Sequence, residues 1–265
     1  MYDFSFDRPK TLEEASRLLA AGGEARYLAG GQTLIPTLKL RLANPGTLID
    51  LKGIAGLDSI ERKGTVLAIG ALVCHAVVAA SPLVHESIPA LAALAGGIGD
   101  VQVRNRGTLG GSVANSDPAA DYPAAVLGLG ATIVTNKREI AADDFFTGMF
   151  ETALKPGEIV ASIGFPVPRR AAYVKFPSPA SHYAMVGVFV AEMAAGIRVA
   201  VTGAAPHVFR WSSAEAALGK RFAAPAIDGL LVSPHELLSD THGNAEYRAS
   251  LVATMTKRAV SAAAA

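Results

Sequence analysis

Two glycine pairs constrain this chain more strongly than any other feature of its sequence. Gly30-Gly31 in "AGGQT" and Gly110-Gly111 in "TLGGS" are each followed by amide or hydroxyl side chains. Glycine adopts positive φ without strain, so successive backbone N–H groups can converge on an anion such as a phosphate. The other two pairs, Gly22-Gly23 and Gly96-Gly97, follow apolar helical patterns and are explained by helix termination. A single glycine turn is most simply structural, but two such turns in separate subdomains could hold a pyrophosphate between them.

The bulk composition indicates a folded globular protein. The 265 residues are 51% hydrophobic and 18% charged. The net charge of +1 gives no electrostatic indication of a nucleic acid or anionic membrane partner, and we expect neither, although bulk charge leaves a local basic patch open. Cys74 is the only cysteine, so this chain alone cannot build a disulfide, an iron–sulfur cluster or a thiolate zinc site. We read Cys74 as a buried, inert thiol and expect no metal site. The start of the chain has no apolar signal segment and no stretch reads as a membrane span, so we expect a cytoplasmic protein.

Hydrophobic periodicity predicts a compact βαβ-like unit near the N-terminus, preceded by a helix with a Thr11–Glu14 capping box. The unit has strands at "ARYL" and "TLIDL", with a helix between them in "TLIPTLKLRLANPG". A different sequence pattern follows. It predicts strands at "TVLAIGAL", "ATIVTN" and "EIVASIGFPV" and helices at "SIPALAALAGGIGD" and "YPAAVLGLG".

The last third of the chain has a different pattern. Residues 172–176, 183–193 and 196–205 read as consecutive strands of an antiparallel meander, followed by helices at 213–219 and 245–263. Prolines and paired arginines in "FPVPRR" mark the boundary. We therefore expect a first domain over 1–170, with subdomains of about 1–55 and 56–170, and a C-terminal domain over 171–265.

The segment 101–121, "VQVRNRGTLGGSVANSDPAAD", reads as neither helix nor strand. Its two arginines, Arg104 and Arg106, could face either phosphate or solvent. Asp117 precedes Pro118 and is most simply an Asx turn or a helix cap. Asp121 could cap the next helix or accept hydrogen bonds from a ribose or a ring N–H. The sequence shows no Ser-His-Asp order, paired carboxylates or activated cysteine, so conventional acid–base or nucleophilic catalysis is unsupported. A Rossmann domain is also disfavoured, because the glycines of "GLGATIV" follow a helix and precede a strand.

The two glycine motifs together resemble a known family. "AGGQTLIPTLKLRLANPGTLIDL" and "GDVQVRNRGTLGGSVANSDPAADYPAA" are similar to the FAD-binding medium subunits of molybdenum hydroxylases, which include carbon monoxide, xanthine and aldehyde dehydrogenases. "GEIVASIGFPVP", "AYVKFPSPASHYAMVGV" and "VAVTGAAP" extend the likeness over nearly the whole chain. The resemblance implies an α+β fold: a two-subdomain FAD-binding domain of the vanillyl-alcohol-oxidase type, then a smaller C-terminal domain of antiparallel sheet plus helices.

The resemblance also implies the cofactor site. The first glycine segment and the second would hold the FAD diphosphate, Asp121 would bind the adenosine side or its ribose, and Lys175 matches a position near the cofactor. The residues of the two segments are Ala29, Gly30, Gly31, Gln32, Thr33 and Leu34, and Thr108, Leu109, Gly110, Gly111 and Ser112. Tyr183 could cover the isoalloxazine ring, although an ordinary strand tyrosine is the simpler interpretation.

The family assigns the molybdenum cofactor to a large partner subunit and two [2Fe–2S] clusters to a small one, in a dimer of heterotrimers. This chain would then be an oxidoreductase subunit that passes electrons from the clusters through FAD to an external acceptor, with no catalytic acid or base of its own. A self-sufficient FAD-dependent oxidase or reductase, and a cofactor-free assembly protein, are the alternatives. The sequence does not identify the substrate or the acceptor.

Overall fold

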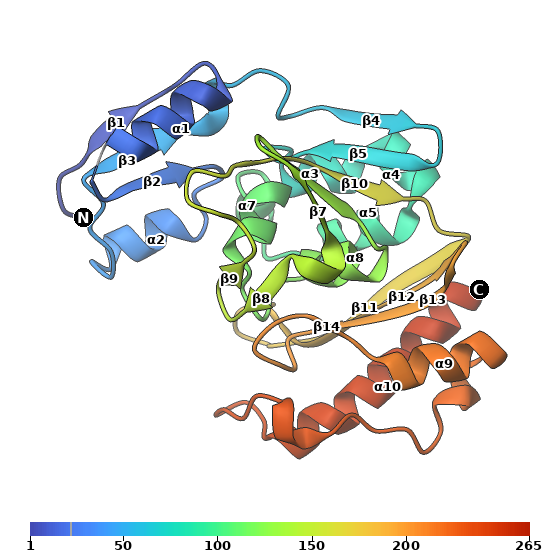
Figure 1. The fold of residues 1–265 in the computed structure, drawn as a ribbon. Coiled ribbons are helices and arrows are strands. Elements are labelled where there is room, and N and C mark those ends of the chain that lie inside the picture. The colour runs from blue at the N-terminus through green and yellow to red at the C-terminus, as the bar shows by residue number, and fades with distance from the viewer. Residues whose placement is uncertain (22) are drawn as a thin grey trace.

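The computed structural model describes residues 1–21 and 23–265. The chain starts with a small three-stranded sheet, β1 (Ser5–Asp7), β3 (Thr47–Asp50) and β2 (Ala25–Leu28), in which β3 is central and both pairings are parallel. Helix α1 (Leu12–Ala21) packs on β2 and β3, and α2 (Leu34–Lys39) connects the two strands. The predicted βαβ unit is therefore confirmed (Figure 1). The predicted helix stop at Gly22 lies outside the described residues.

The second part of the chain is built on a five-stranded antiparallel sheet with helices beside it. The strand order is β4 (Ile60–Lys63), β5 (Val66–Gly70), β10 (Val160–Pro166), β6 (Thr132–Thr135) and β7 (Glu139–Ala141). Its helices are α3 (His75–Ala80), α4 (Pro82–Ser87), α5 (Pro89–Gly96), α6 (Val101–Arg104), α7 (Leu109–Asn115) and α8 (Tyr122–Gly128). A short hairpin, β8 (Phe146–Gly148) and β9 (Glu151–Thr152), and 3-10 turns at Leu51–Gly53 and Ala142–Asp144 complete it.

The last third is a four-stranded antiparallel sheet between two layers of helices. Strands β11 (Arg170–Pro177), β12 (Ala184–Met193), β13 (Gly196–Thr202) and β14 (Phe209–Arg210) follow in sequence order, as the predicted meander requires. Helices α9 (Ser212–Lys220) and α10 (Ala245–Ala264) cover one face, while α5 and α8 contact the other (Figure 1). Two 3-10 turns, Ala224–Ile227 and Pro234–Glu236, lie between α9 and α10.

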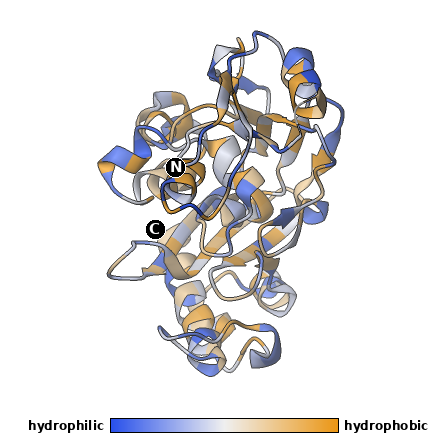
Figure 2. Cartoon of the chain, turned by 90° about the vertical axis from the view of Figure 1, so that its left-hand side faces the viewer, coloured by the Kyte–Doolittle hydropathy of each residue, from blue (hydrophilic) through white to orange (hydrophobic). Residues whose placement is uncertain are grey.

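Strand β12 is apolar almost without interruption because both of its faces are buried. Successive side chains of a strand point to opposite faces. Phe189 belongs to the hydrophobic core shared with the five-stranded sheet and its helices, whereas its neighbours Val188 and Val190 belong to the core formed with α9 and α10. A strand buried on both faces needs no polar alternation. Figure 2 shows hydrophobic residues along the central strands and hydrophilic residues on the outer helices and loops.

The segment 101–121 differs from its prediction, because it contains two short helices. Asp100 caps α6 by accepting from the Val103 N–H at 2.8 Å, and Thr108 caps α7 by accepting from the Gly111 N–H at 3.2 Å. The glycine pair of α7 has unfavourable helix propensity, which concealed the helix from sequence patterns. Tertiary hydrogen bonds to residues 71–73 stabilise α7.

The helix predicted at 33–46 is shorter than expected and ends at Lys39.

Candidate functional site

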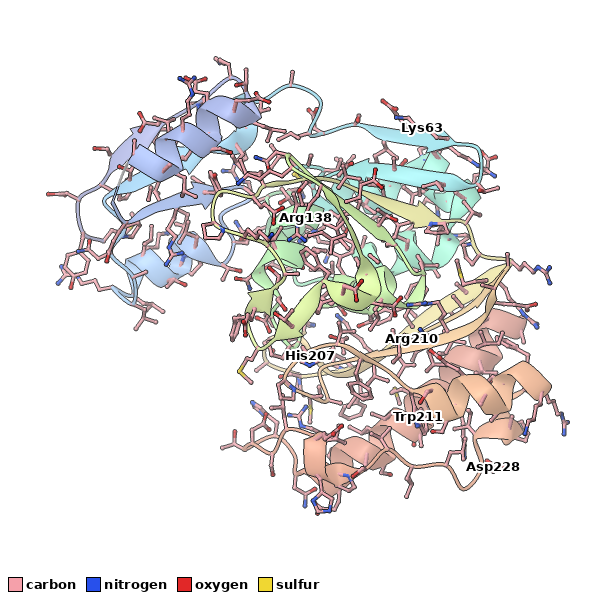
Figure 3. The ribbon with its side chains drawn as sticks, in the orientation of Figure 1. Lys63, Arg138, His207, Arg210, Trp211 and Asp228 are labelled. Carbon is pink, nitrogen blue, oxygen red and sulfur yellow. The ribbon has the colours of Figure 1, made fainter. Side chains whose placement is uncertain are left out.

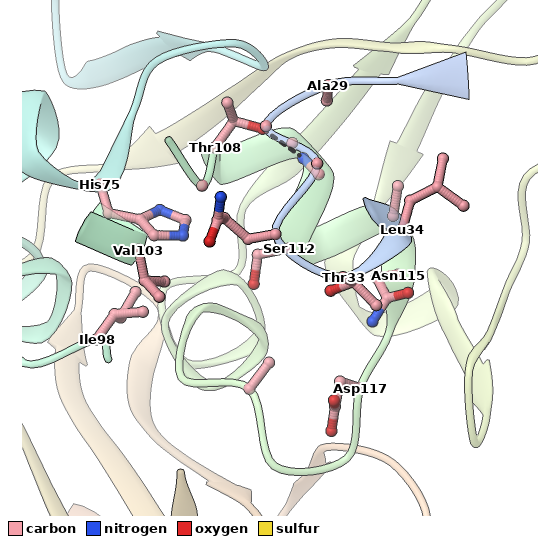
Figure 4. Close-up of a pocket in the computed structure, with 18 of the residues that line it drawn as sticks. Ala29, Thr33, Leu34, His75, Ile98, Val103, Thr108, Ser112, Asn115 and Asp117 are labelled. Atoms are coloured by element: carbon pink, nitrogen blue, oxygen red, sulfur yellow. Dashed lines mark hydrogen bonds between the residues drawn. The ribbon is translucent and has the colours of Figure 1, made fainter. Parts of the chain in front are cut away.

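The two glycine segments lie on opposite walls of one cleft. The cleft has a volume of about 940 Å³ and draws its lining from residues 26–37, 71–75, 98–121, 154–160 and 180–183. A volume of this size is within the range of small-molecule and cofactor pockets, about 300–1,000 Å³. Figure 4 shows Thr33, Leu34, Ser112 and Asn115 among the residues that line it.

The first glycine segment keeps its backbone donors free. Gly31 has a φ of +77°, and α2 begins three residues later. Among the described residues, no chain acceptor binds the backbone N–H groups from Gly30 to Leu34, and none binds the Gln32 amide or the Thr33 hydroxyl. This turn therefore has the donor arrangement that the sequence predicted for an anion.

The second glycine segment is built differently from its prediction. Gly110 and Gly111 lie in the first turn of α7, and neither has positive φ. Their N–H groups are already bonded: Gly110 donates to the Ala71 oxygen at 2.8 Å, and Gly111 donates to Thr108 Oγ1. The glycines are needed instead for close approach, because a Cβ on Gly110 would lie 2.8 Å from the Ala71 Cα. What this segment offers to a ligand is its hydroxyl groups rather than its backbone donors.

A short ladder fixes the position of the second segment. Leu109 donates to the Val73 oxygen at 3.0 Å, and His75 donates from its backbone N–H to the Gly107 oxygen at 3.0 Å. Residues 71–75 thus run antiparallel to residues 107–110, with Cys74 opposite Thr108. Cys74 is half-buried rather than buried as expected.

The two segments meet directly. A Cβ on Gly30 would contact the Arg106 carbonyl oxygen and would lie 2.8 Å from the Gly107 Cα. A Cβ on Gly111 would lie 3.5 Å from the Ala29 Cβ. Only glycine at position 30 lets the two main-chain segments cross at this distance, and residues of both segments line the cleft.

Most of the predicted cofactor residues line this cleft. Those that do are Ala29, Gly30, Gly31, Gln32, Thr33, Leu34, Thr108, Gly110, Gly111, Ser112 and Asp121. Leu109 is fully buried in the hydrophobic core, and Lys175 does not line the cleft. The assignment of these residues to FAD stays a prediction.

Asp121 and Lys175 form a buried junction between the C-terminal sheet and the cleft. Asp121 accepts from the Tyr173 hydroxyl at 2.5 Å and pairs with Lys175 Nζ at 3.0 Å. Lys175 also donates to the oxygens of Gly97, at 2.8 Å, and His182, at 3.0 Å. Burial raises the pKa of Asp121, and the charge of Lys175 opposes that rise. Because Asp121 makes no side-chain cap to α8, the helix-cap interpretation is wrong. Its carboxylate faces the cleft with both oxygens already partnered.

The structure also resolves the neighbouring residues that the sequence left open. Arg104 donates to the Ile98 and Gly99 oxygens at 2.9 and 2.8 Å and so supports the cleft wall, rather than facing phosphate or bulk solvent. Asp117 forms the predicted Asx turn by accepting from the Ala119 N–H at 2.9 Å. Tyr183 lines the cleft directly before β12, with a side chain that is half exposed.

The C-terminal sheet holds the Asp117–Asp121 loop. Thr202 Oγ1 lies 3.0 Å from the Pro118 oxygen and 2.7 Å from the Ala120 oxygen, and the Gly203 N–H donates to Pro118 at 2.7 Å. Behind it, the buried Arg248 donates to the Gly203 oxygen at 2.8 Å. Nothing in the sequence pattern of these residues signalled this support, because it joins positions more than 80 apart.

A second junction ties the C-terminal sheet to the first domain away from the cleft. Arg198 donates to Asp143 at 2.8 Å, and Arg210 lies 3.3 Å from the same carboxylate. Figure 3 shows Arg210 and the buried Trp211 at the end of β14, where the chain enters α9. The two junctions hold the cleft wall and the C-terminal sheet together.

Sequence comparison identifies the family. The family described as "FAD binding domain in molybdopterin dehydrogenase" matches residues 2–168. The chain belongs to this family. Residues 171–263 match the "CO dehydrogenase flavoprotein C-terminal domain". The cofactor is therefore FAD, and the chain is a component of an oxidoreductase.

Several similar proteins match over nearly their whole length. The nicotine 6-hydroxylase medium subunit of Paenarthrobacter nicotinovorans is 34% identical over 95% of this chain and 94% of its own. The carbon monoxide dehydrogenase medium chain of Hydrogenophaga pseudoflava is 35% identical over 98% and 96%. A solved structure of reconstituted carbon monoxide dehydrogenase from Oligotropha carboxidovorans superimposes with a TM-score of 0.91 at 33% identity, covering 99% of this chain and 98% of that one. The predicted α+β fold class is confirmed.

The residues present fit FAD. The cleft combines a glycine turn with free backbone donors and apolar walls at Ile98 and Val103, and the ring of His75 lines it (Figure 4). A dinucleotide needs donors for its phosphates and apolar surface for its rings. No helix in the described ranges 1–21 and 23–265 has the length and apolar character to cross a membrane.

Proposed function

We propose that this chain is the FAD-carrying electron-transfer subunit of a heterotrimeric molybdenum hydroxylase. In this proposal it receives electrons from a small subunit with two [2Fe–2S] clusters and delivers them to an external acceptor. Substrate oxidation occurs at the molybdenum cofactor of a large subunit, and the assembly is a dimer of heterotrimers in the cytoplasm. Support comes from relatives that are named medium subunits or chains and match this chain end to end. With one cysteine, the chain cannot itself ligate an iron–sulfur cluster.

One observation carries the proposal: the two glycine segments of the family motif meet closely and line a single cleft. FAD supplies the capacity to take up and pass on electrons, and the protein supplies binding and orientation. We assign the diphosphate to the free N–H groups of the first segment and the hydroxyls of Thr108 and Ser112. The Asp121–Lys175 junction then sets the position of the cleft wall rather than moving a proton, because both groups are held in a buried ion pair.

The domain division belongs to the same proposal. Residues 1–170 would form the FAD-binding domain, with subdomains of about 1–55 and 56–170, and residues 171–265 the C-terminal domain. The C-terminal domain contributes residues 180–183 to the cleft and holds the Asp117–Asp121 loop from behind. It therefore helps to complete the cofactor site.

The test is purification of the full chain alone and together with the subunits encoded beside it. We expect a yellow preparation with one FAD per chain, no turnover of organic substrates by the chain alone, and reduction of its flavin when the partner subunits are given their substrate. Turnover of an organic substrate by the isolated chain would establish the self-sufficient enzyme instead. A colourless chain that takes up no added FAD would establish the assembly protein.

A further inference from the structure

His75 places an imidazole without a hydrogen-bond partner in the wall of the FAD cleft. The residue begins α3, is 5% exposed and lines the cleft (Figure 4). Within the part of the chain that the structure describes, no group bonds to either ring nitrogen, and Nδ1 is sealed from solvent. Buried polar atoms almost always have partners, so this ring needs an explanation. Because Nδ1 is sealed, Nε2 is the nitrogen that a bound molecule can reach.

The ring lies where the two glycine segments cross. A Cβ on Gly107 would be 2.6 Å from His75 Nε2, and the Gly107 Cα is 2.8 Å from the position of a Cβ on Gly30. The backbone bond from His75 to Gly107 and the packing of the ring on Tyr122, with centroids 5.2 Å apart, fix the imidazole there. His75 Nε2 is thus beside the point at which the proposed function positions the FAD diphosphate.

The ring is neutral at physiological pH. Burial and, to a smaller extent, the nearby positive charge of Arg104 together lower the pKa of His75 to about 4. A neutral imidazole carries one N–H. A proton on Nδ1 would be a buried donor without an acceptor, whereas a proton on Nε2 faces the cleft. The Tyr122 hydroxyl, the other polar group of the ring pair, also lacks a partner among the described residues and offers Nδ1 no bond.

The second glycine segment offers few free hydrogen-bond donors to a ligand in the cleft. Its backbone N–H groups at Gly110 and Gly111 are bonded within the chain. An anion held between the two segments therefore meets free backbone donors on the first side and needs side-chain donors on the second. A phosphate oxygen accepts strongly from such donors.

We propose that His75 is a further FAD-binding residue of this chain, which donates a hydrogen bond from Nε2–H to a phosphate oxygen of the FAD diphosphate. The inference rests on the proposed function, since it uses the diphosphate position assigned there. The role is binding: His75 holds the cofactor and takes no part in electron transfer.

The test compares three ligands on the full-length, flavin-free chain. Dissociation constants for FAD, ADP and riboflavin are measured for the wild type, His75→Phe and His75→Gln. Phe keeps a ring beside Tyr122 without a donor, and Gln restores a neutral donor at a similar reach. His235→Leu, at an exposed histidine outside the cleft, is the matched control. Near-UV circular dichroism and the melting temperature of each flavin-free variant report folding, and His75→Leu substitutes for Phe if the larger ring fails to fold.

Losing a hydrogen bond to a charged group costs about 1.5–3 kcal/mol, so His75→Phe should weaken FAD and ADP alike by about 10- to 100-fold. Riboflavin, which lacks the diphosphate, should bind as it does to the wild type. His75→Gln should recover FAD binding to within about threefold, and His235→Leu should match the wild type. Unchanged FAD affinity in folded His75→Phe, or weakened riboflavin with unchanged ADP, would overturn the inference while leaving the FAD function standing. A wild-type chain that binds no FAD would overturn both.

Discussion

Replacing Gly30 with alanine isolates the steric requirement at the crossing of the two glycine segments. Gly30 does not have positive φ, so the added methyl introduces no backbone strain. It would contact the Arg106 carbonyl oxygen and would lie 2.8 Å from the Gly107 Cα, where ordinary contact starts at 3.4 Å. Both neighbours are backbone atoms, which cannot rotate away. The two segments must therefore separate by roughly 1 Å, and overpacking of this kind costs about 1–3 kcal/mol.

We expect that cost to appear in cofactor binding. Both segments line the cleft, so separating them moves the free N–H groups of the first away from the hydroxyls of the second. A loss of about 1–3 kcal/mol corresponds to roughly 5- to 150-fold weaker FAD binding, measured by flavin fluorescence on the full chain. Gly46→Ala is the matched control, because Gly46 lies in the same subdomain with no atom within 4 Å of its Cβ position. Wild-type affinity in Gly30→Ala would show that the close crossing is not needed for binding.

Three further substitutions test the supports of the site. Thr202→Val removes the hydroxyl that binds the loop at the cleft wall. We expect its unfolding free energy, measured in urea, to fall by about 1–2 kcal/mol and its FAD binding to weaken. The control Thr254→Val removes an exposed hydroxyl on α10 and should leave both quantities as in the wild type. Arg248→Met leaves two buried carbonyls unpaired and should cost about 2–4 kcal/mol in the same measurement, whereas Arg258→Met on the same helix should be neutral within about 0.5 kcal/mol. The folded pKa of His75 is lowered to about 4, so the unfolded chain binds the extra proton first as the pH falls. The contribution of His75 to the unfolding free energy is therefore complete above about pH 6.5 and lost by about pH 4, a difference of roughly 3 kcal/mol. His75→Gln should abolish this pH dependence. Parallel profiles of unfolding free energy against pH for the wild type and His75→Gln would contradict this expectation.

Local hydrophobic periodicity was sufficient to predict the elements whose apolar runs and turns are continuous in the sequence. The βαβ unit and the meander of β11, β12 and β13 follow from apolar runs and turns that sequence patterns report directly. The fold class and the cofactor came from the resemblance, since no physical property of a glycine turn distinguishes FAD from another phosphate ligand. Tertiary hydrogen bonds overrode local propensity at α7, where the ladder with residues 71–75 holds a Gly-Gly pair in a helix.

The candidate site likewise has features that the sequence predicted and features that depend on tertiary contacts. The sequence predicted that the two glycine pairs act together, and the structure brings them to one cleft. It could not show that the second pair serves for close approach, because that depends on Ala71. Arg104 could face phosphate by its sequence, yet it donates to backbone oxygens only five and six residues away. Lys175 matched a position near the cofactor, yet it donates to the Gly97 oxygen from a distant segment. His75 carried no signal at all, since a histidine beside a cysteine in an apolar stretch is a common core pattern.

The hold of Thr202 and Gly203 on the Asp117–Asp121 loop sets an order of events in biogenesis. During synthesis the glycine segments leave the ribosome well before β13, so a nascent chain that ends before residue 202 has both glycine segments but an unsupported loop in the cleft wall. We therefore expect cofactor loading to be a late step that follows translation of β13. Truncation before residue 202 should yield flavin-poor protein, although both glycine segments of the cleft are intact.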